Sequence, residues 1–146
     1  MIEAILFDLG SLVESWDAVD VTLYPDVPLM LLPLRERCSL GVISRNAAAP
    51  EVLARVGLSH LFDAVLTVPD KEDRPGRRDF QRALGEMRAE AGETLNVAGN
   101  AGGVAEAMQA GLKVAVTARH LARDILPEGC VSIQSFEELP ALLMGG

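Results

Sequence analysis

The sequence predicts an α/β fold, a three-layer α/β/α domain with a mainly parallel sheet of five to six strands. Two observations predict it. Short apolar runs alternate with segments of helical periodicity, which is the pattern of parallel strands joined by crossover helices. Several of these runs close on a small or polar residue, as strands do when their last side chain reaches the binding edge of a sheet. Helices are therefore expected on both faces and a functional site at one edge.

Six apolar runs are predicted as strands. The first ends at Asp8, where the run gives way to Gly10 and Ser11. The others lie at 40–44, 62–68, 94–98 and 112–116, with a minor one at 131–133. The acidic stretch 14–26, which contains no basic residue, is predicted as a loop or irregular helix over the Asp8 end of the sheet.

Helix signals fill the intervals between the strands. Pro28 begins a helix that ends at 35–37, and Asn46 is the predicted N-cap of a helix over 47–56 that Gly57 stops. Apolar residues at helical spacing predict helices over 80–91 and 104–108, and Ser135 with Glu138 forms a capping box for the last one.

Length and charge limit the classes of function. The 146 residues are expected to form one domain over 1–146, with roughly two thirds of the unfolded chain's surface buried. A net charge of −8 opposes binding to nucleic acid or to an anionic membrane, because both need clustered basic residues. A small anionic ligand would need a local positive site.

The N-terminus and the cysteines suggest a cytoplasmic protein. The first residues lack the basic segment of a signal peptide and include Glu3 and Asp8. Cys38 and Cys130 lie far apart, with no metal-ligand spacing, and are expected to be buried thiols.

The predicted topology gathers chemistry-bearing residues at one edge. The carboxyl ends of parallel strands meet on the same side of a sheet. Asp8, Ser44 and the pair Gly99-Asn100 follow three of the predicted strands. We therefore expect them to lie close together.

Four stretches, in chain order, resemble the motifs of the haloacid dehalogenase (HAD) superfamily of phosphatases and dehalogenases. F-D-L-G-S-L at 7–12 is similar to F-D-x-D-G-T-L, and L-G-V-I-S-R-N at 40–46 to the second motif. R-P-G-R-R-D-F-Q-R-A-L at 74–84 is similar to K-P-x-P-x-x-F-x-x-A-L, and V-A-G-N at 97–100, followed by A-G at 110–111, to the fourth. The resemblance covers nearly the whole chain and implies a Rossmann-like, HAD-like domain.

The resemblance also implies a reaction and its residues. Asp8 would be the nucleophile of a phosphatase, with Ser44 and Arg74 holding the phosphoryl oxygens. The residues expected to line the substrate site are Gly10, Ser11, Arg45, Asn46, Gly99 and Asn100. Only 36 positions separate Asp8 from Ser44, too few for the helical cap that many relatives insert there, so a capless domain is expected.

Departures from the motifs weaken this chemistry. Gly10 stands where the family has a second Asp acting as general acid and base, a contribution worth about 10²–10⁴-fold in rate. Arg74 replaces a Lys, which keeps the charge but changes its geometry. The implied Mg²⁺ ligands are Asp8, the Gly10 carbonyl and Asn100, and Mg²⁺ should bind poorly to a site with a single carboxylate.

Three functions are compatible with these features. The first is a phosphatase with weakened activity, acting on a small phosphorylated or other anionic molecule. The second is an inactive HAD-like domain that binds a ligand or protein. The third is a metal-independent 2-haloacid dehalogenase, because Asn100-Ala101 is similar to part of that group's fourth motif. Without a cap, a second subunit or a protein partner is expected to cover the Asp8 edge.

Overall fold

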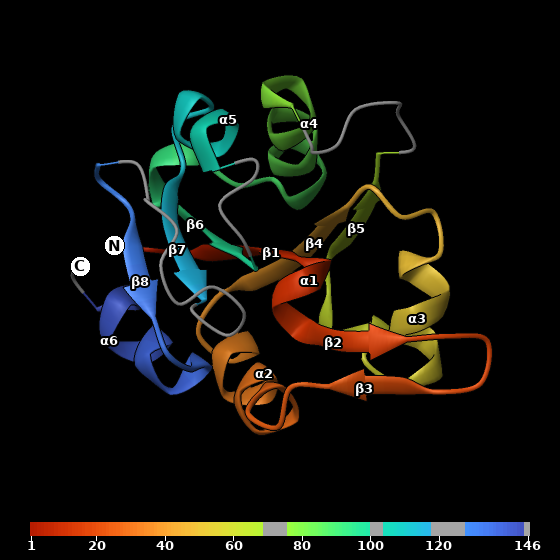
Figure 1. The fold of residues 1–146 in the computed structure, drawn as a ribbon. Helices are drawn as coiled ribbons and strands as arrows, with labels where there is room; N and C mark the ends of the chain where they lie inside the picture. The colour runs from red at the N-terminus through yellow and green to blue at the C-terminus, as the bar shows by residue number, and fades with distance from the viewer. Residues whose placement is uncertain (69–75, 100–103, 118–127, 145–146) are drawn as a thin grey trace.

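A six-stranded parallel sheet organises the protein (Figure 1). The structure, a computed structural model, describes residues 1–68, 76–99, 104–117 and 128–144. The strand order is β5-β4-β1-β6-β7-β8, and each neighbouring pair is parallel. The strands are β1 (Ala4–Asp8), β4 (Ser39–Ser44), β5 (Ala64–Thr67), β6 (Thr94–Ala98), β7 (Lys113–Thr117) and β8 (Val131–Ile133). The predicted α/β class is confirmed, with β1 inside the sheet between β4 and β6.

Helices cover both faces of this sheet, as predicted. One face packs against α2 (Val27–Arg35), α3 (Ala49–Arg55) and α6 (Leu139–Leu143), and the other against α4 (Arg77–Met87) and α5 (Val104–Gln109). Short 3₁₀ turns lie at η1 (Ser59–Leu61), η2 (Ala91–Glu93) and η3 (Phe136–Glu138). Apolar side chains from both faces of the sheet are thereby removed from water, which supplies the main driving force for folding.

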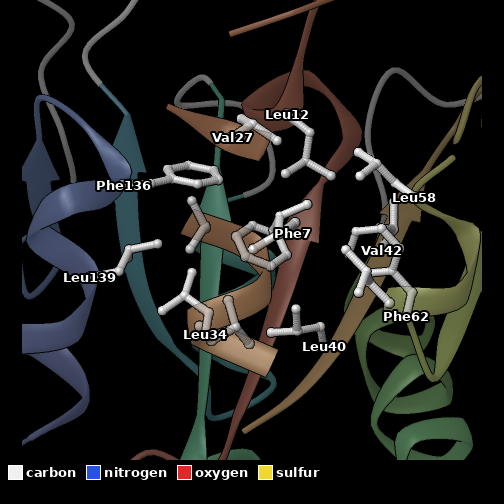
Figure 2. Packing of buried hydrophobic residues seen from close by; sticks show 14 of the residues in the cluster. Phe7, Leu12, Val27, Leu34, Leu40, Val42, Leu58, Phe62, Phe136 and Leu139 are labelled. Carbon is white, nitrogen blue, oxygen red and sulfur yellow. The ribbon is translucent and has the colours of Figure 1, made fainter. Parts of the chain in front are cut away.

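Phe7 is the centre of the core on the α2 face (Figure 2). Its ring packs edge-on against Phe62, at 6.4 Å between centroids, and is stacked with Phe136 at 5.3 Å. Burying such a side chain stabilises the fold by roughly 1.5–3 kcal/mol. Because side chains alternate along a strand, Phe7 on this face places Asp8 on the α4–α5 face. The core thus fixes the direction of the candidate nucleophile.

The stretch predicted as a loop or irregular helix is a β-hairpin instead. β2 (Val13–Trp16) pairs antiparallel with β3 (Val21–Leu23), and a single-turn helix α1 (Leu9–Leu12) joins β1 to this hairpin. The carboxylate of Asp17 accepts hydrogen bonds from the backbone N–H groups of Val19 and Asp20, at 2.7 Å each. The Asp17 side chain therefore stabilises a tight turn between two strands. The acidic composition of this stretch did not indicate such a turn.

Two predicted helix ends are wrong. Asn46 is not the N-cap of α3, because the helix begins only at Ala49 and Ala48 takes the N-cap position. The Asn46 side chain instead accepts from the Ala48 N–H at 2.9 Å, in the turn that precedes the helix. α4 ends at Met87 rather than continuing to Ala91, because Arg88 takes a left-handed backbone conformation with φ of 56°. The predicted capping box of Ser135 and Glu138 is present, but it caps the 3₁₀ turn η3, which leads into the last helix α6.

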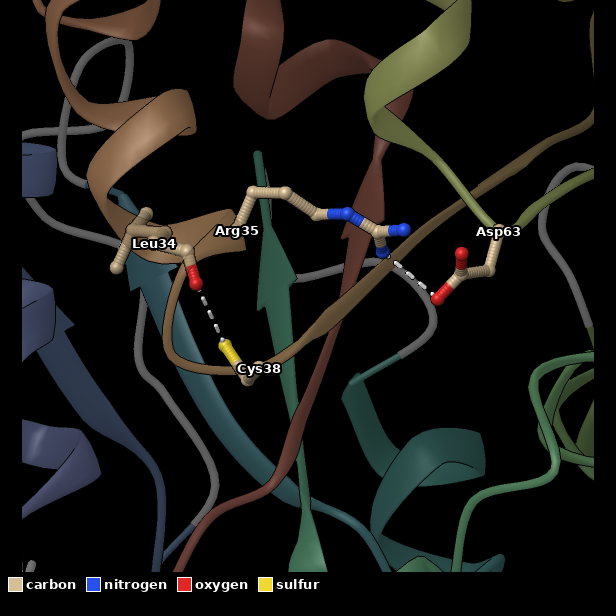
Figure 3. Close-up of polar contacts among 4 residues, drawn as sticks. All are labelled: Leu34, Arg35, Cys38 and Asp63. Carbon is tan, nitrogen blue, oxygen red and sulfur yellow. Dashed lines mark hydrogen bonds and ion pairs between the residues drawn. The ribbon is translucent and has the colours of Figure 1, made fainter.

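Two polar contacts lie at the end of the sheet opposite Asp8 (Figure 3). Arg35, in the last turn of α2, donates to Asp63 at 2.8 Å, and this hydrogen bond lowers the pKa of the Asp63 carboxyl. The buried Cys38 thiol donates to the Leu34 carbonyl at 3.3 Å, and burial raises its pKa to about 11. A thiol held in this state is a poor nucleophile. The expected burial is thus confirmed for Cys38, whereas Cys130 is only partly buried.

Candidate functional site

Asp8 and Ser44 converge at the carboxyl edge of the sheet, together with Gly99. Asp8 is the last residue of β1 and pairs with Ile43 of β4, so Ser44 lies one step further along the neighbouring strand. On the other side Phe7 pairs with Val97 of β6, whose chain continues to Gly99. The expected clustering at one edge is therefore present in the structure.

The carboxyl group of Asp8 is bound by a residue that the motifs did not indicate. Nδ2 of Asn96, in β6, donates to Oδ1 of Asp8 at 3.1 Å and to the backbone carbonyl of Leu6 at 2.8 Å. Asn96 is only 1% exposed. The signal in the sequence is a single Asn in the apolar run 94–98, because Asn is depleted in strands and needs a reason to be there.

Burial dominates the electrostatics of Asp8. It raises the pKa of the carboxyl from 3.8 to about 7, and the hydrogen bond from Asn96 acts in the opposite direction. Desolvation has this effect because a low-dielectric environment penalises the charged form. Near neutral pH the carboxyl therefore titrates, and its ionised form is more basic than that of an ordinary aspartate.

The turn after Asp8 is held from within. The hydroxyl of Ser11, which is fully buried, donates to the backbone carbonyl of Asp8 at 2.7 Å. Gly10 is exposed, and a Cβ at that position would meet no atom within 4 Å. A Cβ on Gly99 would lie 2.7 Å from the Gly10 carbonyl carbon, so the end of β6 directly abuts the α1 turn.

Ser44 is positioned to donate a hydrogen bond. Its side-chain oxygen accepts from the backbone N–H of Asn46 at 3.0 Å, and the residue is 9% exposed. Within the described residues no acceptor takes the hydroxyl hydrogen, so it can be offered to an oxygen of a ligand. Arg45 and Asn46 are exposed beside it. The predicted residues Arg74 and Asn100 lie outside the described residues.

The described residues of the site do not fit a magnesium ion. Within residues 1–68, 76–99, 104–117 and 128–144, no group of three His, Cys, Asp or Glu side chains could hold a metal. Oδ1 of Asp8 already accepts from an amide, and Gly10 brings no side chain. Mg²⁺ prefers several hard oxygen ligands, so these residues would hold it poorly.

A hollow elsewhere is a weaker candidate. It has a volume of about 530 Å³ and lies at the end of the sheet opposite Asp8. Its lining mixes both signs of charge: Met1, Ile2, Glu3, Arg35, Glu36, Arg37, Cys38, Ser39 and Asp63. Open parallel sheets bind ligands at the carboxyl ends of their strands, whereas this hollow lies at the amino ends.

Comparison with known proteins supports the fold assignment. No family model and no curated protein sequence matches the chain. A 2-haloacid dehalogenase from Pseudomonas syringae pv. Tomato DC3000 matches with a TM-score of 0.81 and 17% identity, over 98% of each chain. A HAD phosphatase from Thermococcus onnurineus matches with a TM-score of 0.76 and 24% identity, over 86% of this chain and 60% of the other.

A third solved structure bears on the metal question. The putative HAD-hydrolase YfnB from Bacillus subtilis, bound to magnesium, matches with a TM-score of 0.73 and 18% identity, over 84% of this chain and 57% of the other. At such identities the likeness establishes a fold rather than an activity. This protein therefore has the HAD-like, Rossmann-like fold of phosphatases and dehalogenases, as its motifs suggested.

No helix in the described segments is long and apolar enough to cross a membrane.

Proposed function

We propose that the protein is a hydrolase of the phosphatase type in which Asp8 attacks phosphorus. The observation that carries this proposal is the contact between Asn96 and Asp8. One carboxyl oxygen accepts from the Asn96 amide, while the residue is only half-buried and lies at the edge where parallel sheets bind ligands. The second oxygen, with no hydrogen bond from the described residues, is the attacking atom.

The proposed reaction has two steps. In the first, Oδ2 of ionised Asp8 forms a bond to phosphorus, and the bond from phosphorus to the leaving oxygen breaks with its electron pair. In the second, a water oxygen bonds to phosphorus, the aspartyl oxygen leaves as carboxylate, and inorganic phosphate and a proton are released. Ser44 donates its hydroxyl hydrogen to a phosphoryl oxygen, and Arg74 is the proposed source of positive charge.

Gly10 restricts the substrates. A second carboxylic acid at that position would protonate the leaving group, and the loss of such help costs about 10²–10⁴-fold in rate. We therefore propose that the substrates are small molecules whose leaving group departs as a stable anion, such as acyl or aryl phosphates. Because the domain is proposed to be capless, a second subunit or a protein partner would cover the edge during turnover.

The test compares turnover of acetyl phosphate, 4-nitrophenyl phosphate and an alkyl phosphate by the wild-type protein and the Asp8→Asn variant. The first two should be hydrolysed and the third should not, and Asp8→Asn should abolish hydrolysis while remaining folded by circular dichroism. Each assay is run with Mg²⁺ and with EDTA. Turnover that survives Asp8→Asn, or no turnover of any substrate in either condition, would contradict the proposal.

The absence of a side chain at Gly10 favours a second candidate, an inactive domain that keeps the sheet edge for binding. A binding site needs no proton donor at that position, whereas a phosphatase of broad scope does. Calorimetric titration with inorganic phosphate distinguishes the two, because binding without any turnover supports the binding module. Chloride release from 2-chloropropionate in EDTA would instead identify the dehalogenase chemistry proposed third.

A further inference from the structure

Asn96 is a buried polar residue among apolar neighbours on one face of the sheet. Its neighbours on this face include Leu6 and Ala98, which belong to the apolar core beneath α4 and α5. Asn96 itself is fully enclosed, at 1% exposure. A valine or leucine would fill such a position at lower cost, because burying an amide is unfavourable unless all its hydrogen bonds are made.

The hydrogen bonds of Asn96 are only half complete. Nδ2 donates twice, to the Leu6 carbonyl and to Asp8 Oδ1. Oδ1 of Asn96 is buried, and no donor among the described residues reaches it. Leaving a buried acceptor unsatisfied costs stability, so packing alone does not explain the residue.

The two donated bonds have different uses. The bond to Leu6, two residues before Asp8 on the same strand, fixes the Asn96 amide relative to β1. The bond to Asp8 then transfers that fixed position to the carboxyl group. Among the described residues, this is the one hydrogen bond that fixes the direction of the Asp8 carboxyl oxygens.

We propose that Asn96 is a positioning residue, whose amide holds the Asp8 carboxyl in the orientation that leaves the second oxygen to react. This inference rests on the proposed function, in which Asp8 is the nucleophile. It assigns Asn96 no contact with substrate. Loss of the amide should therefore lower the rate of the chemical step and leave substrate binding nearly unchanged.

The kinetic test uses two substitutions on one strand. Asn96→Leu removes both N–H donors and keeps the number and branching of the side chain's heavy atoms. Thr94→Val is the matched control, because Thr94 is fully buried two residues earlier on β6 and its hydroxyl donates to the Glu90 carbonyl at 2.7 Å, away from Asp8. Asn96→Leu should lower kcat by about 10–100-fold with KM changed less than about twofold, because misplaced reacting atoms cost rates of that order. Thr94→Val should keep the wild-type kcat.

A second measurement does not depend on activity. The side-chain amide resonances of Asn96, assigned as the pair that disappears in Asn96→Leu or, if that variant does not fold, in Asn96→Ala, should exchange slowly with solvent in the wild-type protein. Both should shift in Asp8→Ala, which removes one acceptor. A Thr94→Val spectrum should leave them in place.

The outcomes separate the inference from the proposed function. If the wild type turns over and Asn96→Leu keeps kcat within twofold, the positioning role is overturned while the phosphatase stands. If the wild type is inactive, the proposed function fails and the resonances decide. Asn96 amide resonances that shift in Asp8→Ala support the hydrogen bond from Asn96 to Asp8. Resonances that do not shift overturn the positioning role of Asn96.

Discussion

At the scale of single residues, the burial of Asp8 makes its carboxyl group harder to ionise. Its carboxyl has a pKa near 7 because it is removed from water, and the Asn96 amide recovers only part of the lost solvation. In the unfolded chain the group returns to an ordinary value near 3.8. Between pH 3.8 and about 7, the Asp8 carboxyl binds its proton more tightly in the folded state than in the unfolded state. Folding stability contributed by this group is therefore present at low pH and is lost as the pH rises toward 7.

We expect Asp8→Asn to stabilise the protein at pH 8. The shift from 3.8 to about 7 corresponds to about 4 kcal/mol as an upper limit. Because Asp8 is half-buried and can draw in water, a gain of about 1–4 kcal/mol in the free energy of unfolding is expected. The gain should shrink as the pH falls and vanish below about pH 4. Urea denaturation between pH 4 and 8 measures it.

Asp20→Asn is the control for this prediction. Asp20 is an exposed residue of the β2–β3 turn, so the same chemical change should leave the free energy of unfolding within about 0.5 kcal/mol at each pH. Equal stability of the wild type and Asp8→Asn at pH 8 would mean that the Asp8 carboxyl ionises without penalty.

The placement of Asp8 and Ser44 at one edge could be predicted from the sequence, because each closes an apolar run and strand ends share an edge in a parallel sheet. The contact of Asn96 could not, because its side chain lies within a strand and its partner is 88 positions away. No local pattern encodes such a pairing. Only the register of β1 against β6, with Leu6 opposite Asn96, brings the two side chains together.

At the scale of elements, the contact between the end of β6 and the α1 turn supports the site. Gly99 allows the two backbones to touch, since a Cβ there would lie 2.8 Å from the Gly10 carbonyl oxygen and 3.0 Å from the Ser11 nitrogen. The neighbouring atoms are backbone, which cannot move aside as a flexible side chain can. Any added carbon displaces α1, and with it the turn that follows Asp8.

We predict opposite effects for two alanine substitutions at this contact. Gly99→Ala should destabilise the fold by about 1–3 kcal/mol, as overpacking does in a filled site. Gly10→Ala should be neutral or stabilising by up to about 1 kcal/mol, because its Cβ meets nothing within 4 Å and alanine favours the helical turn. Thermal and urea unfolding of both variants measure the difference. Equal stability of the two would show that β6 and α1 do not touch.

The elements themselves were predicted unevenly. Strands 94–98 and 131–133 have the bounds expected, because apolar runs between turn residues define them. The β2–β3 hairpin was missed because Asp17 organises its turn through a side chain, and polar composition resembles a loop. Arg88 ended α4 early through a left-handed backbone, which periodicity does not indicate.

At the scale of the whole molecule, the fold was predictable because alternation of strands and helices is a property of the entire chain. The net charge of −8 is another such property, with 21 acidic and 13 Lys and Arg residues. Like charges repel in the compact state, and salt screens them over about 8–10 Å at moderate ionic strength. A penalty caused by burial, in contrast, responds little to salt.

Salt should therefore separate the two electrostatic contributions to stability. At pH 8, raising NaCl from 10 to 150 mM should increase the Tm of the wild type by about 1–4 °C, since relief of about 0.5–1 kcal/mol moves Tm by a few degrees in a domain of this size. Asp8→Asn should show the same increase. The difference in stability between the two proteins should stay constant, because burial rather than surrounding charge sets the pKa of Asp8. If the difference in stability between the wild type and Asp8→Asn narrows as salt is added, the negative charges of the surface, acting through solvent, raise the pKa of Asp8.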